Sequence, residues 1–411
     1  MIPENPIKPL RLEDQILLCC ARTPMSGEQA ARLQDLVRGN VNWSLLKQRA
    51  MQHGLLPLVC HNLTHTCSEQ LPQDVVYEFG RYYFAHARRS LSQVSQLFKI
   101  MQLFKQQGIA AIPFKGPMLA LSAYNDVTLR VFDDLDFLLR KKDVLGAKAL
   151  LISQGYRPSF DLESDQESTY LNSPFHYSHH LMRDEGISFV DLHWAVEPTY
   201  LSFVLNSDGL WDRLAEVSLD GHVIQTISRE DMVLLLCIHG ARHRWERLIW
   251  LADLGQLVRT PDGLDWEWIS EQTRKLGNER MLWLGLTLVR DVLGEPLPPA
   301  VSARAEKDGM LETLVGQVKW ELFRENWYVR SGLVSSIFYL KTMKRLSDRM
   351  KYVFSMFVAP TPSEWSDLPL PKRMHFLYYF VRPIRVVSRF LSRPLDYLQE
   401  RKHKEQACHV A

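Results

Sequence analysis

Several features are absent or scarce in this 411-residue chain, and each absence removes a class of protein. Its six cysteines occur without Cys-x-x-Cys spacing, which argues against a disulfide framework and against a structural zinc site. No apolar run of about 18 residues is present, and the first residues form no secretory signal. A Walker lysine loop, a dinucleotide-binding glycine fingerprint and a Gly-x-Ser-x-Gly elbow are also missing. We therefore expect a reduced, cytoplasmic protein outside those enzyme classes.

Three segments differ in their hydrophobic pattern. Through much of residues 1–107, apolar residues recur every three or four positions, which predicts a helical region that ends near Gly108. Residues 108–227 combine short apolar runs with glycine turns and short helices, as an α/β or α+β core does. Within them, residues 175–182 and 187–195 are expected as two strands of a hairpin, with a turn at 183–186. From 228 to 411 the period is helical again. With 46% hydrophobic residues, the chain can bury more than one core.

Charge is distributed unevenly along the chain. Residues 341–411 contain 14 Lys and Arg against 6 Asp and Glu, a net charge of +8. Because the whole chain carries +2, the first 340 residues carry −6. Aromatic residues are interleaved with the basic ones in this C-terminal region. Two interpretations stay open: a solvated face of packed helices, or a contact with something anionic, such as nucleic acid, a membrane surface or an acidic partner.

The most informative stretch is 130–139, RVFDDLDFLL. On a strand, residues i and i+2 point to one face, so Asp134 and Asp136 would lie side by side, with the apolar residues that follow each of them on the opposite face. Paired carboxylates repel each other, and a divalent cation relieves that repulsion, which predicts a site for Mg²⁺ or Mn²⁺. A solvated strand end is the alternative. Asp133 is expected on the other face, as a turn or cap residue.

Two further motifs accompany the acidic pair. In FKGPMLA, residues 114–120, a strand is followed by a glycine turn and a short helix. In FVDLHW, residues 189–194, Asp191 and His193 would share one face of a strand. Nucleotidyl transfer needs a glycine turn near the triphosphate, paired carboxylates and usually a third carboxylate on a neighbouring strand. This chain has all three in that order.

The ordered set resembles the bacterial nucleotidyltransferases of the polymerase-beta-like superfamily. The segments that carry the resemblance are FKGPMLA, RVFDDLDFLL and VDLHW, followed by LCIHGARH at 236–243 and WLADL at 250–254. The likeness extends over roughly residues 108–300.

This resemblance implies an α+β fold, in which a small, mixed five-stranded sheet is flanked by N- and C-terminal helical regions. It also implies transfer of a nucleoside monophosphate from an NTP, such as ATP, to a hydroxyl, phosphate or amine acceptor, with release of pyrophosphate. The implied catalytic residues, which would also hold Mg²⁺ or Mn²⁺, are Asp134, Asp136 and Asp191. The implied nucleotide contacts are Lys115, Gly116, Arg130 and His193. Of these, Lys115 and Arg130 would serve as cations for the triphosphate.

One departure from the superfamily pattern concerns the turn. Pro117 follows Gly116, where the usual turn is Gly-Ser or Gly-Gly, and proline offers no N–H to a phosphate. Phosphate binding would then depend more on Lys115. A non-catalytic protein is therefore the alternative function: it would keep the fold and use its basic C-terminal helices to hold a partner or a membrane surface.

Several candidate residues also have structural explanations. Lys115 and Asp191 could be ordinary surface residues, and Arg130 could form a structural ion pair. His239 and His243 share a helix face, but Gly240 stands where a zinc protease has its glutamate, so we do not favour zinc. The acidic first 340 residues favour a small molecule or a protein as the acceptor over a nucleic acid.

Overall fold

The structure is a computed structural model with an α+β fold, as predicted. It describes residues 10–183, 188–201, 205, 207–260, 263–297, 308–324, 332–361, 364, 367–368, 370–386 and 388. Parts of three sequence predictions lie outside these residues: the N-terminal segment 1–9, most of the expected hairpin turn at 183–186, and the end of the basic region from 389 onward. Within the described ranges, no helix has both the length and the hydropathy that a membrane span requires.

The centre of the molecule is the predicted mixed sheet of five strands, in the order β1-β2-β5-β4-β3. Its strands are β1 (Ala111–Phe114), β2 (Asp134–Leu139), β3 (Arg157–Pro158), β4 (Ser178–Arg183) and β5 (Ser188–His193). β2 and β5 are parallel, and the other neighbouring pairs are antiparallel. Four of these strands lie where the apolar runs predicted them, and the short β3 was not predicted.

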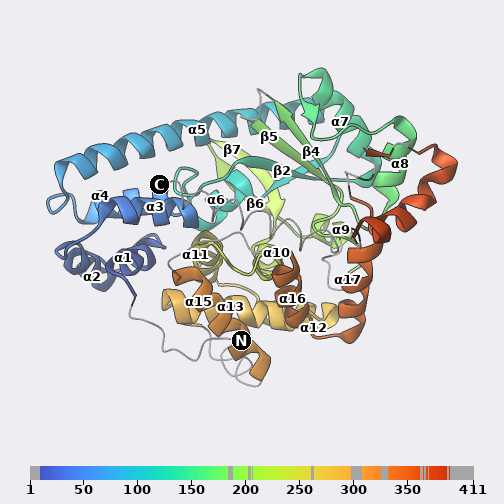
Figure 1. Cartoon of the computed structure of the whole chain (residues 1–411). Coiled ribbons are helices and arrows are strands. Elements are labelled where there is room, and N and C mark those ends of the chain that lie inside the picture. Colours follow the sequence, from blue (N-terminus) through green and yellow to red (C-terminus); the bar gives the residue numbers. More distant parts are fainter. Residues whose placement is uncertain are drawn as a thin grey trace, which may run out of the picture.

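One face of the sheet is apolar and covered by helices. Leu135, Phe137 and Leu139 of β2 belong to a buried cluster together with residues of α5 (Gln73–Gln106) and α7 (Val144–Ser153). In Figure 1, α5 runs along the top of the molecule, above the sheet. The alternation along β2 therefore turns Asp134 and Asp136 to the other face, as the spacing predicted.

The N- and C-terminal helices pack into one common core. The N-terminal helices before α5 are α1 (Leu12–Cys20), α2 (Gly27–Val37), α3 (Trp43–His53) and α4 (Leu56–Thr66). The later helices are α10 (Arg229–Arg242), α11 (Leu248–Val258), α12 (Trp266–Leu276), α13 (Glu279–Leu293), α15 (Gly309–Phe323), α16 (Gly332–Thr342) and α17 (Leu346–Val358), followed by a 3-10 turn, η3 (Lys372–Leu377). The division into 1–107, 108–227 and 228–411 stays a prediction. Helices of the first and last segments contribute side chains to the same buried cluster.

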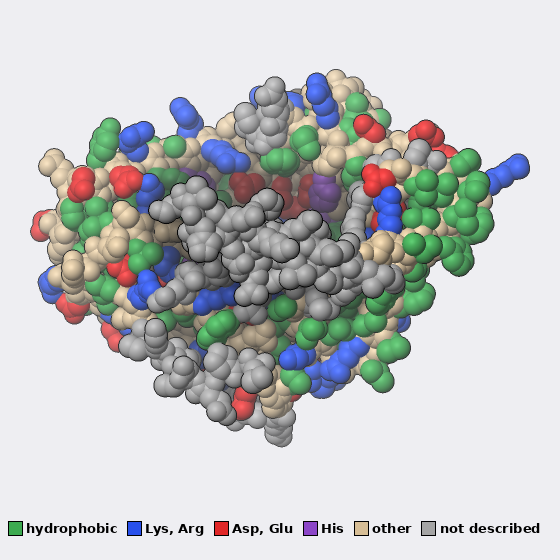
Figure 2. Space-filling model, in the orientation of Figure 1, with side chains coloured by type: hydrophobic (Ala, Val, Ile, Leu, Met, Phe, Trp, Pro, Cys, Tyr) green, Lys and Arg blue, Asp and Glu red, His purple; other side chains and the backbone are tan. Residues whose placement is uncertain are grey.

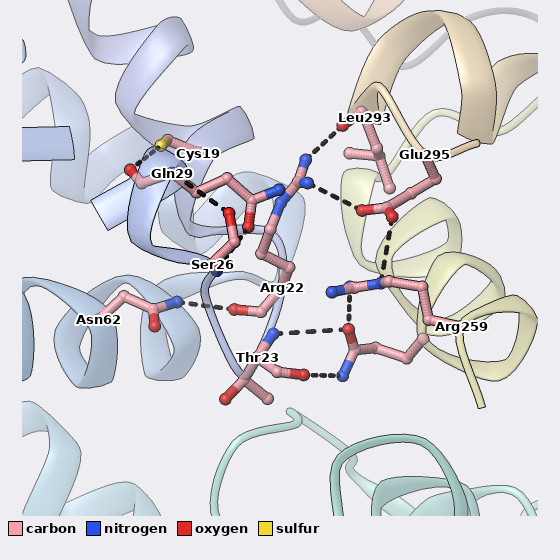
Figure 3. A network of polar contacts seen from close by, with 10 residues as sticks. Cys19, Arg22, Thr23, Ser26, Gln29, Asn62, Arg259, Leu293 and Glu295 are labelled. Atoms are coloured by element: carbon pink, nitrogen blue, oxygen red, sulfur yellow. Dashed lines mark hydrogen bonds and ion pairs between the residues drawn. The ribbon is translucent and has the colours of Figure 1, made fainter. Parts of the chain in front are cut away.

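A polar network joins the two helical regions (Figure 3). Arg22, in the segment after α1, pairs with Glu295 beyond α13 at 2.9 Å, and Arg259 reaches the other oxygen of the same carboxylate at 3.3 Å. Gln256 of α11 donates to the carbonyl oxygen of Thr23 at 2.6 Å. Arg22 and Glu295 are both buried. Segments about 270 residues apart in sequence are thus tied together by buried charges.

A second sheet was missed by the sequence analysis. It is a hairpin of β6 (Leu214–Leu219) and β7 (His222–Ile227), and Thr226 donates to the carbonyl oxygen of Pro113 in β1 at 2.8 Å. Asp220 and Gly221 form its two-residue turn with φ of 50° and 77°. An Asp-Gly pair with both φ values positive is the type I′ turn that favours hairpins, so the signal was present in the sequence. Short helices α6 (Gly116–Tyr124), α8 (Ser164–Asn172) and α9 (Ser207–Trp211) complete this part of the fold.

Candidate active site

The glycine turn brings the end of β1 against the start of β2. Lys115 has φ 52° and ψ −149°, and Gly116 has φ 38°, so both have the positive φ that residues with a side chain rarely adopt. A Cβ added to Gly116 would lie 3.0 Å from the carbonyl oxygen of Asp134. Only glycine fits this approach without displacement, and Lys115 holds a backbone conformation that side chains rarely adopt and that often marks functional sites.

Pairing of β2 with β5 brings the acidic motifs together. In this parallel pair, Asp136 lies opposite Asp191, and Leu138 lies opposite His193. One ligand atom each from Asp136, Asp191 and His193 lies within 4.8 Å of the others. His193 Nε2 is 2.9 Å from Asp136 Oδ1. Two carboxylates and an imidazole so close together form a donor set that can bind a divalent cation.

Asp134 lies beside this group but is not part of it. Its pKa is raised to about 7, first by burial and then by the negative charges of Asp136 and Asp191. Three carboxyl groups therefore act on one another, which is the situation that a bound cation relieves. The neighbouring Asp133 points away, as expected: it is largely exposed and pairs with Arg89 of α5 at 3.0 Å.

Lys115 is the positive charge next to the acidic cluster. Its Nζ lies 3.7 Å from Asp136 Oδ1. Burial by itself would raise the pKa of Asp136, but the charge of Lys115 and the hydrogen bond with His193 outweigh burial and lower that pKa to about 2. Burial would likewise lower the pKa of Lys115, yet the charge of Asp136 raises it. Both side chains are thus held in their charged forms.

His180 is a site residue that the sequence analysis did not identify. Its Nδ1 lies 2.7 Å from Asp191 Oδ1, and this hydrogen bond raises the pKa of the imidazole. The hairpin register explains the omission. A turn at 183–186 would place Ser178 opposite Asp191, whereas the structure pairs Arg183 with Ser188 and therefore sets His180 opposite Asp191.

Arg130 is held by a buried carboxylate rather than facing the acids freely. Its Nε donates to both oxygens of Asp253 in α11, at 3.0 and 3.1 Å, and the hydroxyl of Tyr124 donates to the same carboxylate at 2.9 Å. Asp253 has no exposed surface. The charge of Arg130 still lowers the pKa of Asp134. Arg130 thus forms a structural ion pair, which was the alternative to a nucleotide contact in the sequence analysis. A nucleotide contact by Arg130 stays a prediction.

A cluster of three aromatic side chains lies at the C-terminal end of α10. The rings of His239 and His243 are 4.5 Å apart, and both contact Trp250, at 5.2 and 5.5 Å between centroids. Burial first and the charge of Lys115 second lower the pKa of His239. Among the residues that the structure describes, no third ligand joins these two histidines into a metal site.

Arg242 also lies in the last turn of α10. Its Nη1 pairs with the buried carboxylate of Glu197 at 2.7 Å and donates to the hydroxyl of Tyr177 at 3.0 Å. The Tyr177 ring lies 5.9 Å from that of His193. In Figure 2, acidic and histidine side chains gather in a hollow of the molecule, over the region where Figure 1 shows the sheet.

A comparison with protein-family models agrees with the motifs. Residues 39–294, more than half of the chain, match the model of a family described as "Uncharacterised nucleotidyltransferase". A search of curated proteins finds no significant match. Among solved structures, the chain is similar to the crystal structure of the lincosamide antibiotic adenylyltransferase LnuA with lincomycin bound. That similarity has 16% sequence identity and a TM-score of 0.25, and it covers 44% of this chain and 94% of the other.

Proposed function

The chain belongs to the uncharacterised nucleotidyltransferase family, and we propose that it is an active enzyme that moves a nucleoside monophosphate from an NTP to an acceptor. One observation supports this proposal most: Asp136, Asp191 and His193 converge within 4.8 Å, beside the strained turn of Lys115 and Gly116. A scaffold protein would not need to keep three mutually repelling carboxyl groups at such a turn.

The residues present fit a divalent cation. Asp136, Asp191 and His193 would hold it. Asp134, whose pKa is raised by burial and by the charges of Asp136 and Asp191, would lie next to it. Mg²⁺ or Mn²⁺ bound there would neutralise phosphate oxygens and stabilise the charge that develops on the leaving pyrophosphate. Oxygen-rich ligands suit Mg²⁺, and one imidazole among them also suits Mn²⁺.

The chain's own side chains supply the remaining roles. An oxygen or nitrogen of the acceptor attacks the α-phosphorus, and the bond from that phosphorus to the bridging oxygen breaks, so that pyrophosphate leaves with the electron pair. Lys115, held charged beside Asp136, binds the triphosphate. Gly116 lets the turn approach β2. Asp191, oriented by His180, accepts the proton of the acceptor.

The acceptor is best sought among small molecules and proteins. A nucleic-acid acceptor requires a basic surface around the cleft, whereas the first 340 residues carry a net charge of −6. The aromatic group of His239, His243 and Trp250 and the Arg242 guanidinium offer stacking and anion contacts of the kind that a small substrate uses.

The test is an incorporation assay with matched variants. Purified protein is incubated with Mg²⁺ and each labelled NTP, alone and with fractionated lysate, and pyrophosphate and mass increments are measured. We expect pyrophosphate from at least one NTP, and a loss of about 100-fold or more in Asp136→Asn. Asp133→Asn is the matched control, because Asp133 is an adjacent but exposed acid outside the cluster.

Two results would contradict the proposed activity. Equal turnover by the wild type and by the double variant Asp134→Asn with Asp136→Asn would show that these two carboxylates have no catalytic role. Nucleotide binding by equilibrium dialysis without any pyrophosphate release, with every NTP and lysate fraction, would favour the non-catalytic alternative.

A further inference from the structure

The last helices of the described chain have their polarity inverted. In α17, Asp348 and Ser355 are buried, whereas the large apolar side chains point to solvent. Those exposed residues are Leu346, Met350, Phe354 and Phe357, with 70%, 63%, 63% and 42% of their surface accessible. A helix on the surface of a soluble domain normally shows the opposite arrangement. The apolar stripe of α17 is thus turned outward by the way the helix is docked.

Polar contacts fix this orientation of α17. Ser355 donates to the hydroxyl of Tyr200 at 2.8 Å, and the hydroxyl of Tyr352, one turn earlier, lies 3.4 Å from Ser336 Oγ. Rotating α17 to bury its apolar stripe would break the contacts of Ser355 and Tyr352. These two contacts therefore favour the orientation in which the stripe faces outward.

The next helical segment, η3 with residues 378–386, repeats the pattern. His375 and Tyr378 are buried, and Arg382 pairs with the fully buried carboxylate of Glu364 at 3.1 Å. Large apolar side chains are again exposed at every fourth residue: Phe376, Phe380 and Ile384, at 58%, 65% and 70%. Figure 1 shows both segments at the right-hand edge of the molecule, and Figure 2 shows hydrophobic side chains gathered along that edge.

Basic residues border the two stripes. Lys344 and Arg345 precede α17, Arg373 lies within η3, and all three are exposed. Lys344 also pairs with Glu279 at 3.2 Å, and Arg345 donates to carbonyl oxygens at the end of α12, so these two charges are shared with the protein. Residues 341–411 as a whole carry +8, in a chain whose first 340 residues carry −6. Exposed apolar stripes bordered by Lys and Arg are the signature of helices that lie in the interface of an anionic membrane.

We propose that α17 and the helical segment 372–386 form a docking face for an anionic lipid surface. The apolar side chains would enter the acyl boundary, while the basic residues contact the headgroups. The protein would lie on the membrane rather than cross it, since no described helix is long and apolar enough to span one. A second copy of the chain is the less favoured occupant, because a two-fold contact through this face would bring like charges together. This proposal is independent of the catalytic one.

The test is co-sedimentation of the full-length protein with vesicles. We expect binding to vesicles of equal parts phosphatidylglycerol and phosphatidylcholine, weaker binding to phosphatidylcholine alone, and a decrease as salt is raised. Phe354→Ser with Phe380→Ser should weaken partition by about tenfold or more, because two large apolar side chains leave the lipid. Both positions are exposed, so the fold should be kept, and the variant's thermal unfolding measures this directly.

The matched control is Phe84→Ser, an equally exposed phenylalanine on α5, which should leave partition unchanged. No sedimentation of the wild type with anionic vesicles would overturn the proposal, and so would equal partition of the wild type and the double variant. A wild type that dimerises without lipid in sedimentation velocity, and a double variant that is monomeric, would assign the face to self-association instead. Met350→Ser with Ile384→Ser provides a second variant if the first fails to fold.

Discussion

The buried carboxylate of Asp253 allows a test of what Arg130 does. Asp253 is fully buried and accepts hydrogen bonds from Arg130 and from Tyr124, which belong to segments about 120 to 130 residues earlier in the chain. Burial raises the pKa of Asp253, and the charge of Arg130 opposes that shift. If Arg130 serves the structure, removing its counter-charge should destabilise the fold even when no nucleotide is present.

The expected magnitude follows from the contacts. Asp253→Asn leaves the Arg130 guanidinium without a counter-charge in a buried site, which should lower the free energy of unfolding by about 3–5 kcal/mol. Tyr124→Phe removes one hydrogen bond to a charged acceptor and should cost about 1.5–3 kcal/mol. Replacing both charges with apolar residues, as in Arg130→Met with Asp253→Leu, should recover most of the loss.

Urea denaturation followed by fluorescence of the eleven tryptophans measures these differences. An Asp253→Asn variant that unfolds at the same urea concentration as the wild type would refute the structural role. A double variant no more stable than Asp253→Asn would refute the explanation by an uncompensated charge. The first result would leave the nucleotide contact that the family resemblance implies as the role to test for Arg130.

Three further predictions concern the turn, a buried histidine and the thiols. Gly116→Ala should lower the free energy of unfolding by about 1–3 kcal/mol, because its Cβ meets the carbonyl oxygen of Asp134, whereas Gly146→Ala in α7, with open space around it, should be neutral or stabilising in the same urea titration. Burial lowers the pKa of His53 to about 3, so the unfolded state binds one more proton between pH 6.5 and 3. Stability should therefore fall on acidification, by about 1.4 kcal/mol per pH unit for this one group, and His53→Asn should reduce that slope; an unchanged slope would contradict the assignment. The five described cysteines are buried and free, so dithionitrobenzoate should label them slowly in the native protein and rapidly in guanidinium, and rapid native labelling of more than one thiol per chain would contradict this burial.

Local patterns predicted the local parts of the site. Alternation along residues 134–139 indicated which face of β2 carries the acids, and the Lys115-Gly116 turn indicated where the backbone could approach a ligand. Both follow from neighbouring residues, because strand geometry and glycine φ are properties of a few peptide units. The same kind of signal at Asp220 and Gly221 was present but was not used, and the hairpin β6–β7 was missed.

Contacts between distant segments could not be predicted in this way. The proximity of His180 to Asp191 depends on hairpin register, and a shift in the position of the turn changes which residue faces the acid. Asp253, the partner of Arg130, lies 123 residues later in the chain. The sequence around Asp253 shows only a charged residue within an apolar helix and does not indicate which residue pairs with it. Hydrophobic periodicity describes each element separately, and it contains no information about which element will pack against it.

By itself, the sequence determined the α+β class, the strands that carry Asp134, Asp136 and Asp191, and the excess of positive charge near the C-terminus. Only the tertiary structure decided that Asp136 and Asp191 face each other across β2 and β5, that Arg130 is bound to Asp253, and that α17 turns its apolar stripe outward. The physical reason is that backbone geometry repeats over a few residues, whereas strand pairing, ion pairing and helix rotation depend on the packing of the whole chain.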